Sequence, residues 1–200
     1  MIRRTFVPLT LVALLLGAGA QAQDTGKAPE MTPEQKAEMD LYIKAGTPGP
    51  QHQKLASAAG TYSVKAKSWH EPGGPADEES GTATRTMALD GRVLVEDFKG
   101  TMMGNPFSGH GMTGYDNVSG KYWSTWTDSM STGLMLSQGT CDAKMACTFN
   151  GSWNDPVKKG PVKSRMTSRW TSPTTEVFEM YGPDKKGNEM KMMELTYTKN

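Results

Sequence analysis

A single carboxylate stands among large apolar residues near the middle of the chain. In the stretch 121–130, Trp126, Asp128 and Met130 alternate with polar neighbours. Successive side chains of a strand point to opposite faces, so these three are expected to share one face. If that face points into a protein interior, Asp128 must be paired or protonated there.

Two arginines are candidate partners for this carboxylate. Arg165 and Arg169 share one face of the expected strand 161–171. An apolar pocket with a few convergent polar groups is typical of a site for an amphipathic ligand. In the alternative, structural interpretation, Asp128 caps backbone N–H groups of the following turn.

A hairpin near the C-terminus supplies a second candidate wall. If Gly182 faces Asn188 across the turn, Phe178 and Met180 lie on one face together with Met192 of the partner strand. The ligand-binding residues predicted from these patterns are Trp126, Asp128, Met130, Arg165, Arg169, Phe178, Met180, Met192 and Glu194.

The sequence contains no recognisable catalytic or metal motif. It lacks a nucleophile elbow and zinc-ligand spacing, and the methionine pairs suit an apolar wall better than copper(I). His110 lies within an expected strand, where a structural role is commoner than haem ligation. Asp128 and Glu194 could perform acid–base chemistry only if they met. We therefore predict no catalytic residue, no metal and no cofactor.

Two cysteines frame a short loop. Cys141 and Cys147 flank residues 142–146, and strands on either side would bring them within bridging range. The spacing fits neither a redox C-x-x-C pair nor a zinc site. A disulfide is expected in an oxidising compartment.

The strands that would position these residues can be predicted from the turns between them. Turn signals recur about every ten residues from Gly60 onward. Between the turns, apolar and polar residues alternate, which is typical of short antiparallel strands. Glycines clustered over 100–114 favour the coiling of a closed barrel. The expected strands are 61–70, 79–88, 92–102, 106–115, 121–130, 133–141, 147–154, 161–171, 174–181 and 189–198.

The N-terminal region differs from the rest. Residues 1–22 combine Arg3 and Arg4 with an apolar run and a small-x-small site, which predicts a secretory signal peptide cleaved before Gln23. Residues 23–31 are expected to be a disordered linker. Two short helices are expected over about 32–59. The first has a capping box at Thr32 and Gln35 and an apolar stripe of Met39, Tyr42 and Ile43. The barrel domain, helices included, spans 32–200.

Charge excludes some classes of partner. The formal net charge is +1, and it becomes −1 without Arg3 and Arg4 because residues 1–22 contain no acidic residue. An interspersed, near-neutral charge pattern lacks the basic surface of a nucleic-acid-binding protein. No segment after the signal peptide is apolar for long enough to suggest stable membrane insertion. Oligomeric state is left open.

Three blocks resemble a bacterial family called domain of unknown function 1579. They are 52–62, then 89–117 with 124–139, and finally 177–181 with 193–197; within the middle block, residues 100–107 onward are the most specific part. Tyr62, where the family commonly has Trp, and the cysteine hairpin depart from its pattern. The resemblance implies a lipocalin-like barrel and no established catalytic residues.

The combined expectation is a mainly β, up-and-down antiparallel barrel of about ten strands, preceded by two short helices. It would be periplasmic or secreted and would bind a small hydrophobic or amphipathic ligand. The alternatives are an enzyme that uses the same cavity and an envelope interaction module.

Overall fold

The structure is a computed structural model that describes residues 30–200. The expected signal peptide and nearly all of the expected linker lie outside this range. The elements are α1 (Pro33–Gly46), α2 (Pro50–Ser57), β1 (Gly60–Ser68), β2 (Asp77–Ala88), β3 (Val93–Met102), β4 (Asn105–Asp116), β5 (Lys121–Asp128), β6 (Met135–Cys141), β7 (Cys147–Asp155), β8 (Gly160–Ser172), β9 (Thr175–Pro183) and β10 (Glu189–Lys199).

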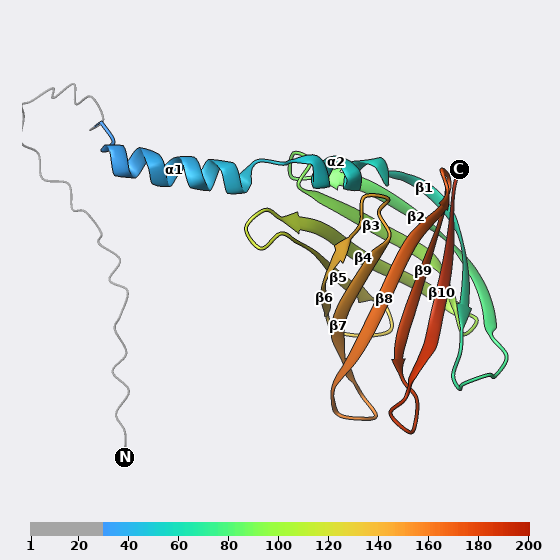
Figure 1. Ribbon diagram of the computed structural model, residues 1–200. Helices are drawn as coiled ribbons and strands as arrows, with labels where there is room; N and C mark the ends of the chain where they lie inside the picture. The colour runs from blue at the N-terminus through green and yellow to red at the C-terminus, as the bar shows by residue number, and fades with distance from the viewer. Residues whose placement is uncertain (1–29) are drawn as a thin grey trace, which may run out of the picture. The chain divides into compact units, whose positions relative to one another are not determined.

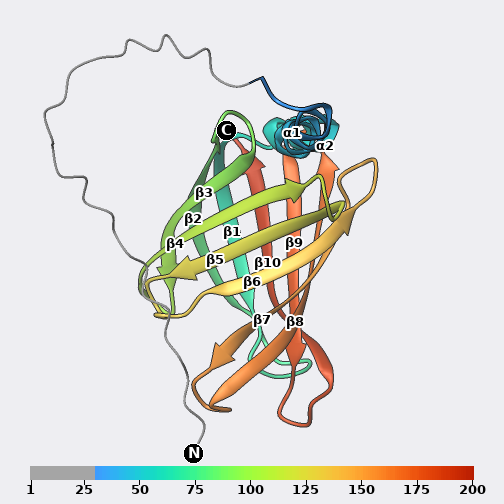
Figure 2. The same ribbon diagram turned by 90° about the vertical axis from the view of Figure 1, so that its left-hand side faces the viewer.

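The ten strands form one closed antiparallel barrel, which confirms the predicted fold class. Each strand pairs with its sequence neighbours, and β1 pairs with β10 to close the sheet. Figures 1 and 2 show β4, β5 and β6 crossing obliquely over β1, β10 and β9. Closure leaves no unpaired strand edge, so alternate side chains of every strand point into one interior.

The predicted register of the last hairpin is wrong. Pro183, not Gly182, begins the pairing, and it faces Glu189. Asp184 closes the turn, since its backbone N–H donates to the carbonyl of Asn188 at 2.8 Å. The register then shifts between Lys191 and Met193. Such a bulge moves all later side chains to the opposite face of the sheet.

Two of the clustered glycines make room for an interior ring. A Cβ atom at Gly109 would lie 2.2 Å from the Trp126 indole, and one at Gly111 would lie 3.0 Å from it. Both positions face β5, with Gly111 directly opposite Trp126. Absent side chains on β4 therefore allow the indole to lie flat against the inner wall.

The helix α2 covers one end of the barrel. Its Leu55 and the following Ala58 are buried against Leu94 of β3 and Tyr122 of β5. The Tyr62 hydroxyl donates to the carbonyl of Ala58 at 2.7 Å, which joins α2 to the first strand. One of the two expected helices thus covers an open end.

The helix α1 differs from its prediction in one respect. The capping box is present, since Thr32 and Gln35 exchange backbone-to-side-chain hydrogen bonds of 2.9 and 3.3 Å. The predicted apolar stripe of Met39, Tyr42 and Ile43 is exposed, however. A helical period shows which residues share a face but not whether another element covers it. Within residues 30–200, no helix has the length and apolar character needed to cross a bilayer.

Candidate ligand cavity

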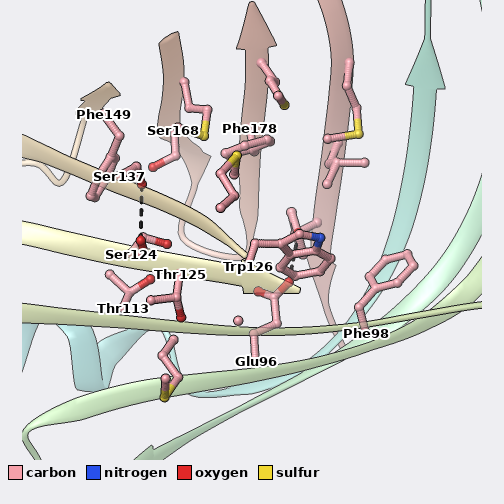
Figure 3. Close-up of a pocket in the computed structure, with 18 of the residues that line it drawn as sticks. Glu96, Phe98, Thr113, Ser124, Thr125, Trp126, Ser137, Phe149, Ser168 and Phe178 are labelled. Carbon is pink, nitrogen blue, oxygen red and sulfur yellow. Dashed lines mark hydrogen bonds between the residues drawn. The ribbon is translucent and has the colours of Figure 1, made fainter. Parts of the chain in front are cut away.

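A cavity of about 420 Å³ occupies the barrel interior. Leu55 and Ala58 line it at the α2 end, and Met102 and Asp128 line it toward the opposite end. Figure 3 shows Phe98, Trp126 and Phe178 entering it from three different strands. Its aromatic walls are made by Phe98, Phe107, Trp126, Phe149, Trp170 and Phe178.

Three charged side chains meet inside the barrel, toward the α2 end. The Arg85 guanidinium of β2 donates from Nε to Glu96 of β3 and from Nη1 to Glu176 of β9, each at 2.5 Å. Arg85 and Glu176 are only 8% and 9% exposed. All three line the cavity. Their formal charges sum to −1. Lys54, Glu79 and Asp128 also line the cavity, so its two cationic and four anionic side chains together carry a formal charge of −2.

Two tyrosines complete this cluster. The Tyr197 hydroxyl donates to Glu96 at 3.1 Å. The Arg85 guanidinium carbon lies 4.3 Å from the centre of the Tyr197 ring and 4.9 Å from that of Tyr62. A guanidinium over an aromatic face is attracted by the ring quadrupole. Arg85 is therefore held by the two carboxylates through its N–H groups and by the two tyrosine rings through the face of its guanidinium.

Burial and charge fix the protonation of two members. Burial by itself would lower the pKa of Arg85, but Glu96 and Glu176 raise that pKa well above its usual value. Burial, reinforced by Glu96, raises the pKa of Tyr197 well above its usual value. Arg85 thus stays charged, and the Tyr197 phenol stays protonated as a hydrogen-bond donor.

Four of the sequence-predicted site residues line the cavity: Trp126, Asp128, Phe178 and Met180. The Trp126 indole donates to Asp128 at 3.0 Å. Asp128 also accepts the backbone N–H of Met130 at 2.9 Å, as the structural interpretation expected. Asp128 therefore both orients a wall residue and caps a turn.

The other five predicted residues do not line the cavity. Arg165 pairs with Glu189 at 2.8 Å and Arg169 with Glu179 at 2.9 Å. Met166 of β8 lines the cavity, and Arg165 and Arg169 alternate with it along the strand, so both arginine side chains lie on the other face of β8. The two arginines therefore do not reach Asp128. The remaining three are Met130, which is exposed, Met192, which lies at the bulge, and Glu194, which pairs with Lys191.

The cluster of Arg85, Glu96, Glu176 and Tyr197 was not predicted from sequence. A signal was present, because Arg85 alternates in phase with Ala83 and Glu176 alternates in phase with Phe178. A charged residue in the apolar phase of a strand indicates a buried ion pair or a site.

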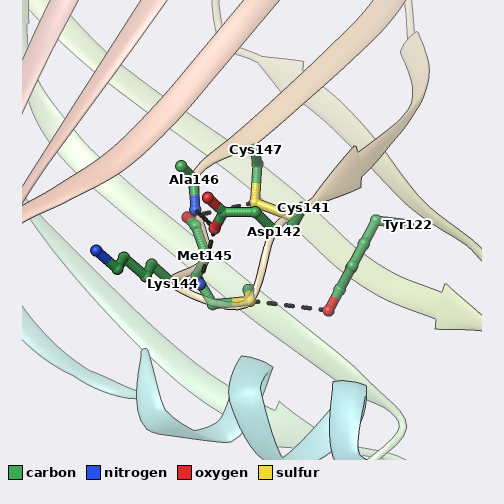
Figure 4. Close-up of a disulfide and its surroundings, with 7 residues drawn as sticks. All are labelled: Tyr122, Cys141, Asp142, Lys144, Met145, Ala146 and Cys147. Atoms are coloured by element: carbon green, nitrogen blue, oxygen red, sulfur yellow. Dashed lines mark hydrogen bonds between the residues drawn. A yellow bond between two sulfur atoms is a disulfide. The ribbon is translucent and has the colours of Figure 1, made fainter.

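The disulfide between Cys141 and Cys147 is present, as predicted. Both cysteines and the intervening Met145 line the cavity near its α2 end. Figure 4 shows Tyr122 directed toward Met145, and its hydroxyl lies 3.7 Å from the methionine sulfur. The bridge therefore holds a hairpin that forms part of the cavity wall.

The three histidines lie elsewhere. His110 pairs with Asp97 at 2.8 Å and is about half exposed, and His70 pairs with Asp77 at 2.9 Å. His52 is buried in α2, where its Nδ1 accepts the backbone N–H of Gly49. None of them lines the cavity, so none is placed to ligate a group bound there.

The geometry defines a class of protein: a ten-stranded antiparallel barrel whose interior holds an apolar cavity with a charged cluster. Residues 47–199 match the model of the family described as "Protein of unknown function (DUF1579)". The chain belongs to this family, as the three sequence blocks indicated. A search of curated proteins found no match.

One solved structure supports the fold. The crystal structure of Rv2717c from M. tuberculosis aligns with a TM-score of 0.58 at 10% identity, covering 77% of this chain and 99% of that chain. At this identity the likeness shows the fold alone. A redesigned beta barrel, b11L5F_LGL, aligns at a TM-score of 0.37 and 16% identity, covering 73% of this chain and 94% of that chain, and adds nothing to the assignment.

Proposed function

We propose that this protein binds a small hydrophobic or amphipathic molecule inside its barrel. The observation that carries the proposal is the cavity of about 420 Å³, whose lining combines aromatic and other apolar side chains with serine and threonine hydroxyls and the charged cluster. Ligand pockets commonly have volumes of about 300–1,000 Å³ and this mixture of linings. A barrel of this size class holds one small ligand.

The proposal includes export to the periplasm or the exterior. It is supported by the signal-peptide pattern of residues 1–22 and by the disulfide between Cys141 and Cys147. Disulfides persist in oxidising compartments and are rare in the cytosol. Mass spectrometry of the protein from its own host should find a mature N-terminus at Gln23. An intact residue 1–22 segment would contradict export by cleavage.

Titration with N-phenyl-1-naphthylamine, a neutral apolar fluorophore, tests the binding site. Ser168 lines the cavity, as Figure 3 shows, and Ser168→Phe would fill part of it. The matched control is Thr148→Phe, because Thr148 is exposed on the adjacent strand β7. We expect saturable binding to the wild type and the control, and at least tenfold weaker binding to Ser168→Phe.

Two results would contradict interior binding. One is equal affinity in all three proteins, with circular dichroism confirming that each is folded. The other is the absence of any bound molecule when the protein purified from its own host is examined by native mass spectrometry, combined with no binding of the fluorophore. Native mass spectrometry needs no substitution, so it remains decisive if Ser168→Phe does not fold.

A further inference from the structure

The charged cluster inside the barrel constrains the head group of the ligand. Arg85, Glu96 and Glu176 carry a formal charge of −1 and face a cavity with apolar walls. Charge interactions are stronger in a low-dielectric interior than in water. A ligand that places a positive charge there would neutralise the cluster, whereas an anion would add a second uncompensated charge.

The hydrogen-bonding pattern points in the same direction. Glu96 uses both carboxylate oxygens, one for Arg85 and one for Tyr197. Glu176 uses only Oε2, and no group within residues 30–200 donates to its Oε1. This side chain is nine-tenths buried. Oε1 itself keeps some accessible surface, and Glu176 lines the cavity. A ligand N–H or O–H group can therefore reach this free acceptor and form a charge-assisted hydrogen bond.

Arg85 also has a free group, since Nη2 has no partner within residues 30–200, but this donor lies beside two carboxylates. Its guanidinium is paired with carboxylates at Nε and Nη1, and the Tyr62 and Tyr197 rings lie against it. An anionic head group near Arg85 would also lie near both carboxylates, and like charges in close contact oppose binding.

The walls beyond the cluster suit an apolar tail and a cation. Phe98, Trp126 and Phe178 line the same cavity. Aromatic faces attract ammonium groups in addition to burying hydrocarbon.

We propose that the cavity takes a cationic amphiphile, an organic amine with a hydrocarbon tail, whose ammonium group binds at Glu176 and Glu96. This inference rests on the proposed ligand-binding function and specifies the chemical class of the ligand. Alcohols of the same length are weaker ligands, and fatty acids are the weakest.

Three probes that differ only in head group test the proposal: decylamine, decanol and decanoate. Isothermal titration calorimetry at neutral pH and low salt, below the micelle concentration of each probe, gives the affinities. We expect the amine to bind at least tenfold more tightly than the alcohol, and the acid to bind least tightly.

The decisive variant is Glu176→Gln, which keeps the shape of the side chain and brings the formal charge of the cluster to zero. The expected result is a loss of at least tenfold in decylamine affinity, with decanol affinity nearly unchanged. The matched control is Glu179→Gln on the same strand, which removes a carboxylate that does not line the cavity. Unchanged decanol binding also shows that the variant is folded.

The outcomes separate this inference from the proposed function. Decanoate binding as tightly as decylamine, with naphthylamine binding intact, would overturn the choice of head group and leave interior binding standing. An equal loss of amine affinity in Glu176→Gln and Glu179→Gln would assign the effect to the net charge of the protein rather than to a contact in the cavity, and would also overturn it. If neither the three probes nor the fluorophore binds, both proposals fail together.

Discussion

Ion pairs of two kinds occur in this protein, and their burial decides what each contributes. Arg85 is buried between Glu96 and Glu176, whereas Arg169 pairs with Glu179 while its own side chain is 49% exposed. Breaking a buried pair leaves an uncompensated charge in the interior, but exposed pairs contribute little because water and salt screen them. An arginine inside the barrel therefore contributes more to stability than an arginine on the outer face of the sheet.

Arg85→Met should be strongly destabilising. The substitution leaves Glu96 and Glu176 without their cation, and we expect the free energy of unfolding to fall by about 3–5 kcal/mol. Arg169→Met, the matched control, should cost less than about 1 kcal/mol. Urea denaturation followed by tryptophan fluorescence measures both values. Equal costs in the two variants would show that the interior cluster is not a strong interaction.

Glu179 should govern part of the acid sensitivity. Hydrogen bonding from Lys191 is the main cause that lowers the pKa of Glu179 to about 2 from 4.5; burial opposes it, and Arg169 reinforces it. Because the folded-state pKa is depressed, the stabilisation is complete above about pH 4.5 and is lost as the pH falls toward 2. Glu179→Gln removes this dependence.

The measurement is the free energy of unfolding between pH 4.5 and 2, in the wild type and in Glu179→Gln. The wild type should lose stability more steeply over this window than the variant. A suitable control is Glu71→Gln, since Glu71 is exposed and forms no salt bridge within the described part of the chain. A variant curve that runs parallel to the wild-type curve would refute this role of Glu179.

At the scale of elements, the hairpin of β6 and β7 shows how a local turn is stabilised. The hairpin of β6 and β7 is held twice, by the bridge between Cys141 and Cys147 and by Asp142. The Asp142 carboxylate accepts the backbone N–H groups of Lys144 and Ala146 at 2.8 and 2.9 Å. Side-chain acceptors of this kind stabilise a turn without a covalent link. We therefore expect the two strands to stay paired when the bridge is removed.

Replacing both cysteines by alanine should be tolerated. Because the closed loop is short, the chain-entropy model gives a loss of about 2 kcal/mol in the free energy of unfolding. We expect the variant to fold with an unchanged far-ultraviolet circular dichroism spectrum and a lower urea midpoint. An unfolded variant would show that the bridge, rather than the turn, organises this end of the barrel.

At the scale of the whole molecule, closure creates the candidate site. Arg85 and Glu176 are 91 residues apart in sequence, and their strands, β2 and β9, are not neighbours in the sheet. They meet because pairing of β1 with β10 curves the sheet into a barrel. An open sheet with the same ten strands would leave these charges apart and would have no interior.

Ligand binding should therefore be coupled to the stability of the whole barrel. A molecule that binds only the folded state stabilises it by about 2.7 kcal/mol at a concentration one hundred times its Kd. Decylamine at this concentration should raise the melting temperature of the wild type, and by clearly less at the same concentration in Glu176→Gln. A rise of equal size in the two proteins would indicate binding outside the cavity.

The local sequence pattern was sufficient to predict the strands and the disulfide of this protein. Alternation and turn residues predicted all ten strands to within a few residues, and the spacing of Cys141 and Cys147 predicted the bridge. These features depend on backbone conformation and on neighbours in sequence. Of the residues predicted for the candidate site, four line the cavity: Trp126, Asp128, Phe178 and Met180.

Only the tertiary structure decided which charges share the interior. The phase of a strand shows which side chains lie together, but not which face points inward or which distant strand lies opposite. Arg165 and Arg169 thus pair on the outer face, while Arg85 meets Glu176 across the barrel. The bulge after Lys191 likewise depends on pairing in three dimensions, because one extra residue reverses the faces of everything that follows.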